Sequence, residues 1–332
     1  MADEAQERRK LGGAVFARVK DHAWSIIGVM AVIVSVWLLY HEVRNISLDD
    51  IIDSLEAITP LNWLLAAGAT ILAYAALAGY DKIALRHLGK HVSWPFVTLC
   101  SFTTYALAHN IGASVVSGAV VRYRAYTTKG LTGAEVAVLV ALCSFTFLLG
   151  TVLLSGIVLL IEPALVARFF DGAPNWLGVT GGLLVLALVG AYVFGSWMGL
   201  RPARIGKFEI RYPRMPVVWR QLVIGPLELI GAGAIIYFAL PEAGNPGFIV
   251  ILGLFLASFS AALLSHAPGG LGVLELVFIT GLPDMNPADV LAALIVFRAF
   301  YLLIPLALSL VVIAVFERSQ YLRRQAGLQA GD

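Results

Sequence analysis

Eight long stretches of this chain contain few or no Asp, Glu, Lys and Arg residues, and they limit the fold more than any other sequence feature. They cover residues 23–40, 61–80, 92–121, 136–161, 172–200, 217–240, 243–274 and 290–316. A membrane-crossing helix needs roughly 20 mostly apolar residues. Charged residues make up 13% of the 332 positions, against about a quarter in soluble domains. This excludes a soluble globular protein, a disordered chain and a nucleic-acid-binding domain, and predicts an all-α polytopic membrane protein.

Two of the stretches, residues 92–121 and 243–274, are too long for one ordinary crossing and too short for two. Each contains helix-breaking residues near its middle, namely Asn110 and Gly112 in the first and Pro268, Gly269, Gly270 and Gly272 in the second. Half-helices of roughly 13 residues reach about 20 Å at the usual helical rise. We therefore predict re-entrant hairpins over residues 92–121 and 243–282.

The basic residues give the expected orientation, because short cytoplasmic loops are enriched in Lys and Arg. If both hairpins return to the side from which they enter, 20 of the 23 basic residues lie on the cytoplasmic side. Arg44 and Arg168 then lie outside, and Arg298 lies within a helix. A full crossing by residues 92–121 would place ten basic residues outside instead. We expect six full crossings, two oppositely oriented hairpins and both termini in the cytoplasm.

Opposed hairpins are typical of an inverted repeat. Weak internal similarity agrees, since His109 aligns with His266 and Gly112 with Gly269. We divide the chain into a basic cytoplasmic N-terminus (1–22), a first membrane repeat (23–161), a second membrane repeat (162–316) and a cytoplasmic tail (317–332).

Residues 46–58 form a different kind of segment, with apolar residues near helical spacing and acidic residues on the other face. The segment is too short and too polar to span a bilayer. We predict a helix that lies in the membrane surface, with Asn45 or Ser47 as its N-cap.

Three charged side chains are expected inside the membrane, where ionised groups are costly and face a cavity or a partner. Glu275 follows the second hairpin tip, Arg298 lies in the last crossing, and Glu228 lies in the crossing before the second hairpin. Arginine donates two parallel hydrogen bonds to phosphate. We predict that Arg298 binds a lipid phosphate, while Glu275 and Glu228 meet an amine or a proton. A pair that only fixes helix packing is the alternative.

The end of the first hairpin supplies two more candidates for the headgroup site, Arg122 and Arg124, which at this spacing do not share a helix face. Anchoring at the membrane surface is the alternative for both. His109 and His266 are expected at the hairpin tips, where capping of a broken helix is the simpler role. Zinc needs three or four ligands, so we expect no metal site. Cys100 and Cys143 lie in apolar stretches and read as small buried residues.

Several sequence elements resemble the lysylphosphatidylglycerol synthase transmembrane region, the flippase part of the bacterial multiple peptide resistance factor. The first lies at residues 109–112 (His-Asn-Ile-Gly) and 117–126 (Ser-Gly-Ala-Val-Val-Arg-Tyr-Arg-Ala-Tyr). The second lies at residues 265–275 (Ser-His-Ala-Pro-Gly-Gly-Leu-Gly-Val-Leu-Glu), and the third at residues 298–301 (Arg-Ala-Phe-Tyr), followed by Pro305. The resemblance covers nearly the whole chain.

This resemblance implies a bacterial inner-membrane flippase that moves phospholipid, often aminoacylated phosphatidylglycerol, between leaflets. Full-length members add a soluble transferase domain, whereas this chain stops at Asp332, so we expect a protein that is not an enzyme. We expect phospholipid as substrate, no cofactor and no nucleic acid, and we leave a homo-oligomer open. The alternative is a non-transporting partner that binds anionic lipid through its basic loop, residues 201–220, and supports a separate lipid-modifying enzyme.

Overall fold

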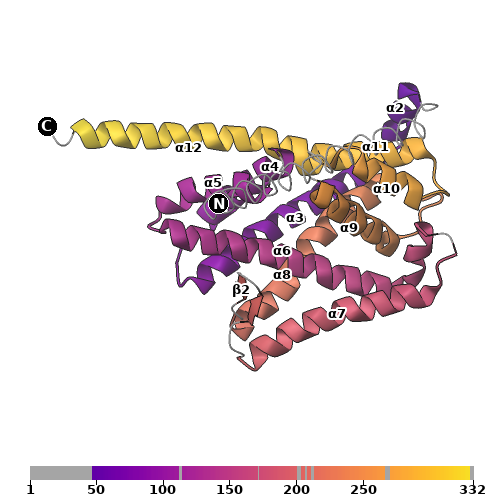
Figure 1. Ribbon diagram of the computed structural model, residues 1–332. Coiled ribbons are helices and arrows are strands. Elements are labelled where there is room, and N and C mark those ends of the chain that lie inside the picture. The colour runs from indigo at the N-terminus through magenta and orange to yellow at the C-terminus, as the bar shows by residue number, and fades with distance from the viewer. Residues whose placement is uncertain are drawn as a thin grey trace, which may run out of the picture.

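The computed structural model describes residues 47–111, 114–170, 172–199, 203–205, 208–210, 213–265 and 270–329. These residues are almost entirely helical (Figure 1). The predicted N-terminal segment 1–22 and the first crossing, residues 23–40, lie outside the described residues. The predicted all-α polytopic membrane fold is thus confirmed at the level of helical architecture and apolar spans.

Five helical segments of the described chain are long and apolar enough to cross a membrane. They are α3 (Pro60–His87), α6 (Gly133–Ile161), α7 (Asn175–Trp197), α8 (Met215–Ala239) and the segment Pro287–Phe316. Each coincides with a predicted crossing, because such a helix is set by local hydropathy. Helix α3 continues past the predicted end at residue 80 to His87, so Asp81 and Lys82 lie within it.

Small residues allow the central helices to approach closely. Helices α3 and α8 share the most extensive helix contact, and α6 packs against both. A Cβ added at Gly150 of α6 would lie 2.7 Å from the carbonyl oxygen of Gly225 in α8. One added at Gly231 of α8 would lie 2.9 Å from the carbonyl oxygen of Ala69 in α3. In lipid the hydrophobic effect does not drive helices together, so close backbone contacts of this kind supply the van der Waals energy of helix packing.

Two shorter helix pairs occupy the predicted hairpin regions. The first pair is α4 (Trp94–Ile111) with α5 (Ser114–Thr127), and the second is α9 (Phe248–Ser265) with α10 (Val273–Gly281). The members of each pair pack against one another. Their turns at residues 112–113 and 266–269 lie outside the described residues, and with them the predicted tip residues Gly112, His266, Pro268 and Gly269.

The first pair begins and ends near the N-terminal end of α6, and the second pair ends near the other end of α6. At the first turn of α6, Glu135 forms an ion pair of 2.9 Å with Lys90, which precedes α4. Lys129, which follows α5, lies 4.7 Å above the ring of Phe96 in α4. Beyond the other end of α6, Arg168 in the 3₁₀ segment η1 (Pro163–Arg168) donates to the carbonyl oxygen of Gly281, the last residue of α10, at 2.7 Å. Helix α6 has 29 residues, or about 43 Å of helix.

The last predicted crossing is one long helical path with a break in its middle. It consists of α11 (Pro287–Phe297), a π-helical turn η3 (Arg298–Leu303) and α12 (Ile304–Gln329). Pro305 has no N–H to donate to the carbonyl oxygen of Tyr301, so a regular α-helical ladder is interrupted there. Helix α12 runs on to Gln329, beyond the predicted end at residue 316; it packs against α4, and its C-terminal end extends past the other helices (Figure 1).

One short helix and one pair of short strands complete the described chain. Helix α2 (Leu48–Glu56) lies within the predicted surface helix 46–58, and the Ser47 side chain caps it by accepting from the Asp50 N–H at 3.1 Å. Strands β1 (Ala203–Ile205) and β2 (Phe208–Ile210) pair antiparallel, with Arg204 opposite Glu209. The basic connection expected to be a loop thus contains a short ribbon, the one departure from an all-helical fold among the described residues.

Candidate functional site

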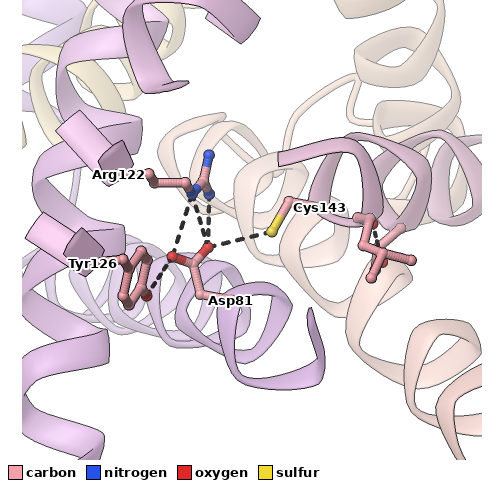
Figure 2. A network of polar contacts seen from close by, with 6 residues as sticks. Asp81, Arg122, Tyr126 and Cys143 are labelled. Atoms are coloured by element: carbon pink, nitrogen blue, oxygen red, sulfur yellow. Dashed lines mark hydrogen bonds and ion pairs between the residues drawn. The ribbon is translucent and has the colours of Figure 1, made fainter. Parts of the chain in front are cut away.

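A buried ion pair joins α3 to α5 at the centre of a polar network (Figure 2). The Arg122 Nη2 donates to Asp81 Oδ1 at 2.7 Å, and Nε lies 3.2 Å from the same oxygen and 3.3 Å from Oδ2. Asp81 is fully buried and Arg122 is 4% exposed. In apolar surroundings neither charge is tolerable alone, so each residue requires the other.

Three further side chains surround this pair. Tyr126, one helical turn after Arg122, donates its hydroxyl to Asp81 Oδ2 at 2.7 Å. The thiol of Cys143 in α6 lies 3.4 Å from Asp81 Oδ1, and the Tyr105 ring lies 4.8 Å from the guanidinium carbon of Arg122. The Asp81 carboxylate therefore receives donors from α5 and α6, and the cation gains an aromatic face.

One nitrogen of Arg122 points away from Asp81 in Figure 2. This nitrogen, Nη1, would lie 3.5 Å from a Cβ added at Gly118, which would also approach the Thr104 methyl group at 3.1 Å. Nη1 is thus turned toward the interface of α4 and α5, where a larger residue at position 118 would crowd it. Two of the three guanidinium nitrogens serve Asp81, and the third keeps donor capacity.

A second ion pair links α10 to the π-helical turn. The Arg298 Nη2 and Nε donate to Glu275 Oε1 at 2.5 Å and 3.1 Å. The other oxygen, Oε2, accepts from the backbone N–H of Gly272 at 2.8 Å, so Glu275 also caps its own helix. The Arg298 and Glu275 side chains are 15% and 12% exposed. Glu275 and Arg298 therefore form an ion pair, a possibility that the sequence left open.

The third predicted acid, Glu228 of α8, has a different environment. It is 1% exposed, and its Oε1 accepts a hydrogen bond from the Tyr301 hydroxyl in η3. Its Oε2 has no hydrogen-bond partner among the described residues. Glu228 is thus a buried carboxyl group that accepts a hydrogen bond from a tyrosine. Unlike Asp81 and Glu275, it forms no ion pair with an arginine of the described residues.

The π-helical turn gains its missing backbone partners from neighbouring helices. The carbonyl oxygen of Tyr301, freed by Pro305, accepts from the Tyr74 hydroxyl of α3 at 2.9 Å. The next carbonyl oxygen, of Leu302, accepts from the Asn110 side chain at 3.1 Å. Broken helices in lipid require such substitutes. Asn110, predicted as a tip residue, therefore ties the end of α4 to the break in the last crossing.

His109 lies beside the same turn. Its ring stacks on that of Tyr301, with centroids 5.0 Å apart and an angle of 19° between the planes. Its Nδ1 is buried with no hydrogen-bond partner among the described residues.

In the second pair, Gly270 and Gly272 have φ angles of 67° and 79°, a left-handed conformation that favours glycine. Gly270 and Gly272 thus adopt the backbone geometry that a sharp turn into α10 needs.

The two arginines predicted after the first hairpin separate as their spacing indicates. Arg122 is buried, whereas Arg124 is exposed on the other face of α5. Headgroup binding by either residue stays a prediction. Cys100 and Cys143 are buried and free. Among the residues that the structure describes, no group of three or more His, Cys, Asp and Glu side chains is arranged to hold a metal ion.

Sequence reasoning missed Asp81 and the buried roles of Tyr126 and Tyr301. Asp81 follows the apolar stretch 61–80 directly and is followed by Lys82, so it reads as a loop residue. The available signal was the apolar run that resumes with Ile83, Ala84 and Leu85, all buried in α3. Tyr126 and Tyr301 are both 0% exposed, and they donate to the carboxylates of Asp81 and Glu228, respectively.

Comparison with known sequences decides the family. The model of the lysylphosphatidylglycerol synthase TM region matches residues 25–309, most of the chain. This chain belongs to that family. The resemblance drawn from the elements at residues 109–126, 265–275 and 298–301 is therefore confirmed.

Several relatives share this membrane region. The chain is 26% identical over 311 residues to the uncharacterized protein slr0712 of Synechocystis, covering 93% of this chain and 96% of the relative. It is 30% identical over 258 residues to the inner membrane protein YbhN of Escherichia coli, with coverage of 76% and 80%. It is 26% identical over 293 residues to the phosphatidylglycerol lysyltransferase of Staphylococcus haemolyticus, covering 84% of this chain but 32% of that protein.

Proposed function

We propose that this member of the lysylphosphatidylglycerol synthase TM family moves phospholipid between the leaflets of a bacterial inner membrane, without being an enzyme itself. The observation that carries the proposal is the presence of two arginine–carboxylate pairs, Asp81–Arg122 and Glu275–Arg298, inside an apolar helical bundle. Buried ion pairs are weak evidence for stability, because well-packed apolar residues often serve equally well. Intramembrane ionisable groups instead mark pathways for polar cargo.

In this mechanism, each carboxylate keeps its arginine charged and positioned inside the membrane until a lipid phosphate binds. A phosphodiester accepts the same paired hydrogen bonds as a carboxylate, so it replaces Glu275 on Arg298 or Asp81 on Arg122. Arg122 begins this exchange through Nη1, the nitrogen turned away from Asp81. The released carboxylate meets the amine of a cationic headgroup. The acyl chains stay in the bilayer while the headgroup passes between the helices.

The arrangement of the short helix pairs supports two re-entrant hairpins of opposite orientation. The contacts of Lys90 with Glu135 and of Lys129 with Phe96 bring both ends of the α4–α5 pair to the N-terminal end of α6. The contact of Arg168 with Gly281 brings the end of α10 to the other end of α6. We propose an inverted repeat of residues 23–161 and 162–316, six full crossings and cytoplasmic termini, with alternating access by rocking of the repeats.

Lipid translocation in proteoliposomes tests this function. The purified chain is placed in vesicles with acyl-labelled phosphatidylglycerol, and loss of label from the outer leaflet is followed. We expect translocation by the wild type and a large loss in Arg298→Ala and Glu275→Gln. Arg220→Gln is the matched control, because Arg220 is exposed and, among the described residues, its side chain donates to a backbone carbonyl oxygen of its own helix at 3.1 Å.

Normal translocation by correctly folded Arg298→Ala and Glu275→Gln proteins would contradict this residue assignment. A wild-type protein that moves no lipid, yet copurifies with a soluble lipid-modifying enzyme, would favour the supporting role instead. The basic connection between α7 and α8 is then the segment to remove, since cations near an anionic surface contribute roughly 1 kcal/mol each.

A further inference from the structure

We propose that Glu228 is a proton-binding site and that its proton couples lipid movement to a pH gradient across the membrane. This inference rests on the proposed lipid transport and adds an energy source to it. Proton binding forms an O–H bond at Glu228 Oε2 and removes the carboxylate charge, and release breaks that bond again. The proton comes from the aqueous phase on one side and leaves to the other.

One carboxylate oxygen of Glu228 accepts no hydrogen bond from the described residues. Oε1 accepts from the Tyr301 hydroxyl, but Oε2 is buried without a partner among the described residues. A buried carboxyl oxygen without a donor loses its hydration and gains nothing in return. Asp81 and Glu275 differ, since every one of their carboxylate oxygens receives a donor. Among these three intramembrane acids, Glu228 is the one with a carboxylate oxygen that a proton is able to occupy without displacing a hydrogen bond.

No Lys or Arg of the described residues forms an ion pair with Glu228. Helices α6, α7, α9 and α11 contain no Lys, Arg or His within their bounds. Arg298 is paired with Glu275 and Arg122 with Asp81, while Arg220 of the same helix is exposed. In α3, Lys82 donates to the Val92 carbonyl oxygen at 2.6 Å. Because no Lys or Arg of the described residues pairs with Glu228, a proton takes the place of its charge partner in this proposal.

The groups that face Glu228 are tyrosines. Besides Tyr301 of η3, the titratable side chains that interact with it are Tyr74 and Tyr80 of α3. Tyr80 donates to the Gly225 carbonyl oxygen at 3.1 Å and Tyr74 to that of Tyr301 at 2.9 Å. His109 stacks on the Tyr301 ring. In α6 and α11 the remaining acids, Glu135 and Asp289, lie in the first turns of their helices, and Cys143 contacts Asp81.

The proton on Glu228 acts on the lipid site through the π-helical turn. Tyr301 and Arg298 belong to the same π-helical turn, so one residue reaches Glu228 and the other reaches Glu275. A hydrogen bond to an ionised acceptor is roughly twice as strong as one to a neutral acceptor. Protonation therefore weakens the hold of Glu228 on Tyr301. Since π-turns are alternative arrangements of an α-helix, release of Tyr301 lets the turn shift and move Arg298 relative to Glu275.

The test measures lipid distribution in proteoliposomes of phosphatidylethanolamine and phosphatidylglycerol that contain acyl-labelled phosphatidylglycerol. With one proton moved per lipid, a gradient of one pH unit supports about tenfold accumulation in one leaflet. We expect accumulation by the wild type that reverses when the gradient is reversed. We expect Glu228→Gln to equilibrate the label without accumulation. Glu242→Gln, an exposed acid after the same helix, is the control that keeps the wild-type response.

The outcomes separate the two proposals. A wild type that moves no lipid in any gradient overturns the proposed function and this inference with it. A wild type that moves lipid at the same rate and to the same distribution in all gradients overturns this inference alone. Accumulation retained by folded Glu228→Gln shows that another group carries the proton. If the Glu228→Gln protein misfolds, a measurement on the wild type still tests the coupling. Proton uptake is therefore also recorded in wild-type vesicles with an internal pH dye. Lipid accumulation without proton uptake overturns the coupling.

Discussion

The hydroxyl of Tyr74 donates a 2.9 Å hydrogen bond to the backbone carbonyl oxygen of Tyr301, 227 positions later in the chain. The acceptor is the carbonyl group that Pro305 deprives of its helical donor. Both tyrosines are buried, at 8% and 0% exposure. A side chain of α3 therefore completes the backbone of the last crossing, and the break at η3 depends on the helix packed against it.

Tyr74→Phe is expected to destabilise the protein, because it leaves this carbonyl oxygen buried without a donor. The loss is about 1–3 kcal/mol for an unsatisfied buried group. Thermal unfolding in detergent measures it. The control is Tyr237→Phe, since Tyr237 makes only ring contacts with Phe238 and Phe248 among the described interactions. Equal unfolding temperatures for the two variants would contradict the structural role of Tyr74.

Asp81→Asn is expected to destabilise strongly, because it leaves Arg122 buried without its counter-charge. Breaking a buried pair costs about 3–5 kcal/mol. The double variant Asp81→Asn with Arg122→Gln is expected to recover part of that loss, since the uncompensated cation is gone. Denaturant unfolding of the single and double variants measures the coupling. Asp53→Asn on the exposed side of α2 is the control, with an expected change within about 0.5 kcal/mol. Additive losses in the double variant would argue against a mutual dependence.

The membrane helices were predictable from the sequence, whereas the network around Asp81 was not. Hydropathy is a local property, so residues 61–80 and 136–161 indicated α3 and α6 with only their ends displaced. Asp81 and Arg122 are 41 positions apart, and only the packing of α5 on α3 shows that they meet. For a charged residue at the end of an apolar stretch, the neighbouring sequence does not show whether it lies in an exposed loop or in a buried ion pair.

The π-helical turn shows the same limit. A proline within a helix, such as Pro305, causes a kink or break, but the type of break depends on which donors lie nearby. Tyr74 and Asn110 supply those donors from α3 and α4. The pairing of Glu275 with Arg298 was left open by the sequence, but it was the more accessible alternative, because charged residues in otherwise apolar segments need a partner. Sequence therefore identified charged residues within long apolar stretches, and the structure identified their partners at helix ends and breaks.

Gly150→Ala is expected to destabilise the crossing of α6 and α8. The added methyl group would lie 2.7 Å from the Gly225 carbonyl oxygen, so the helices must separate. Overpacking of this kind costs about 1–3 kcal/mol. Gly190→Ala in α7 is the matched control, because its methyl group meets nothing within 4 Å. That change is expected to stabilise by about 0.5–1 kcal/mol through helix propensity. Thermal unfolding of both variants checks the difference in sign, and equal shifts would contradict the close crossing.

The final prediction concerns the orientation of the two helix pairs. Single cysteines are placed at His91 and Thr128, the exposed positions on either side of α4–α5, and at Glu242 and Asp284, which flank α9–α10. The native Cys100 and Cys143 are buried, at 6% and 2% exposure, and leave a low background. If both pairs are re-entrant, positions 91 and 128 react with an impermeant thiol reagent only from the cytoplasmic side. Positions 242 and 284 then react from the outside. Reaction of positions 91 and 128 from opposite sides would show that the first pair crosses the membrane fully, and would remove the basis for the inverted repeat.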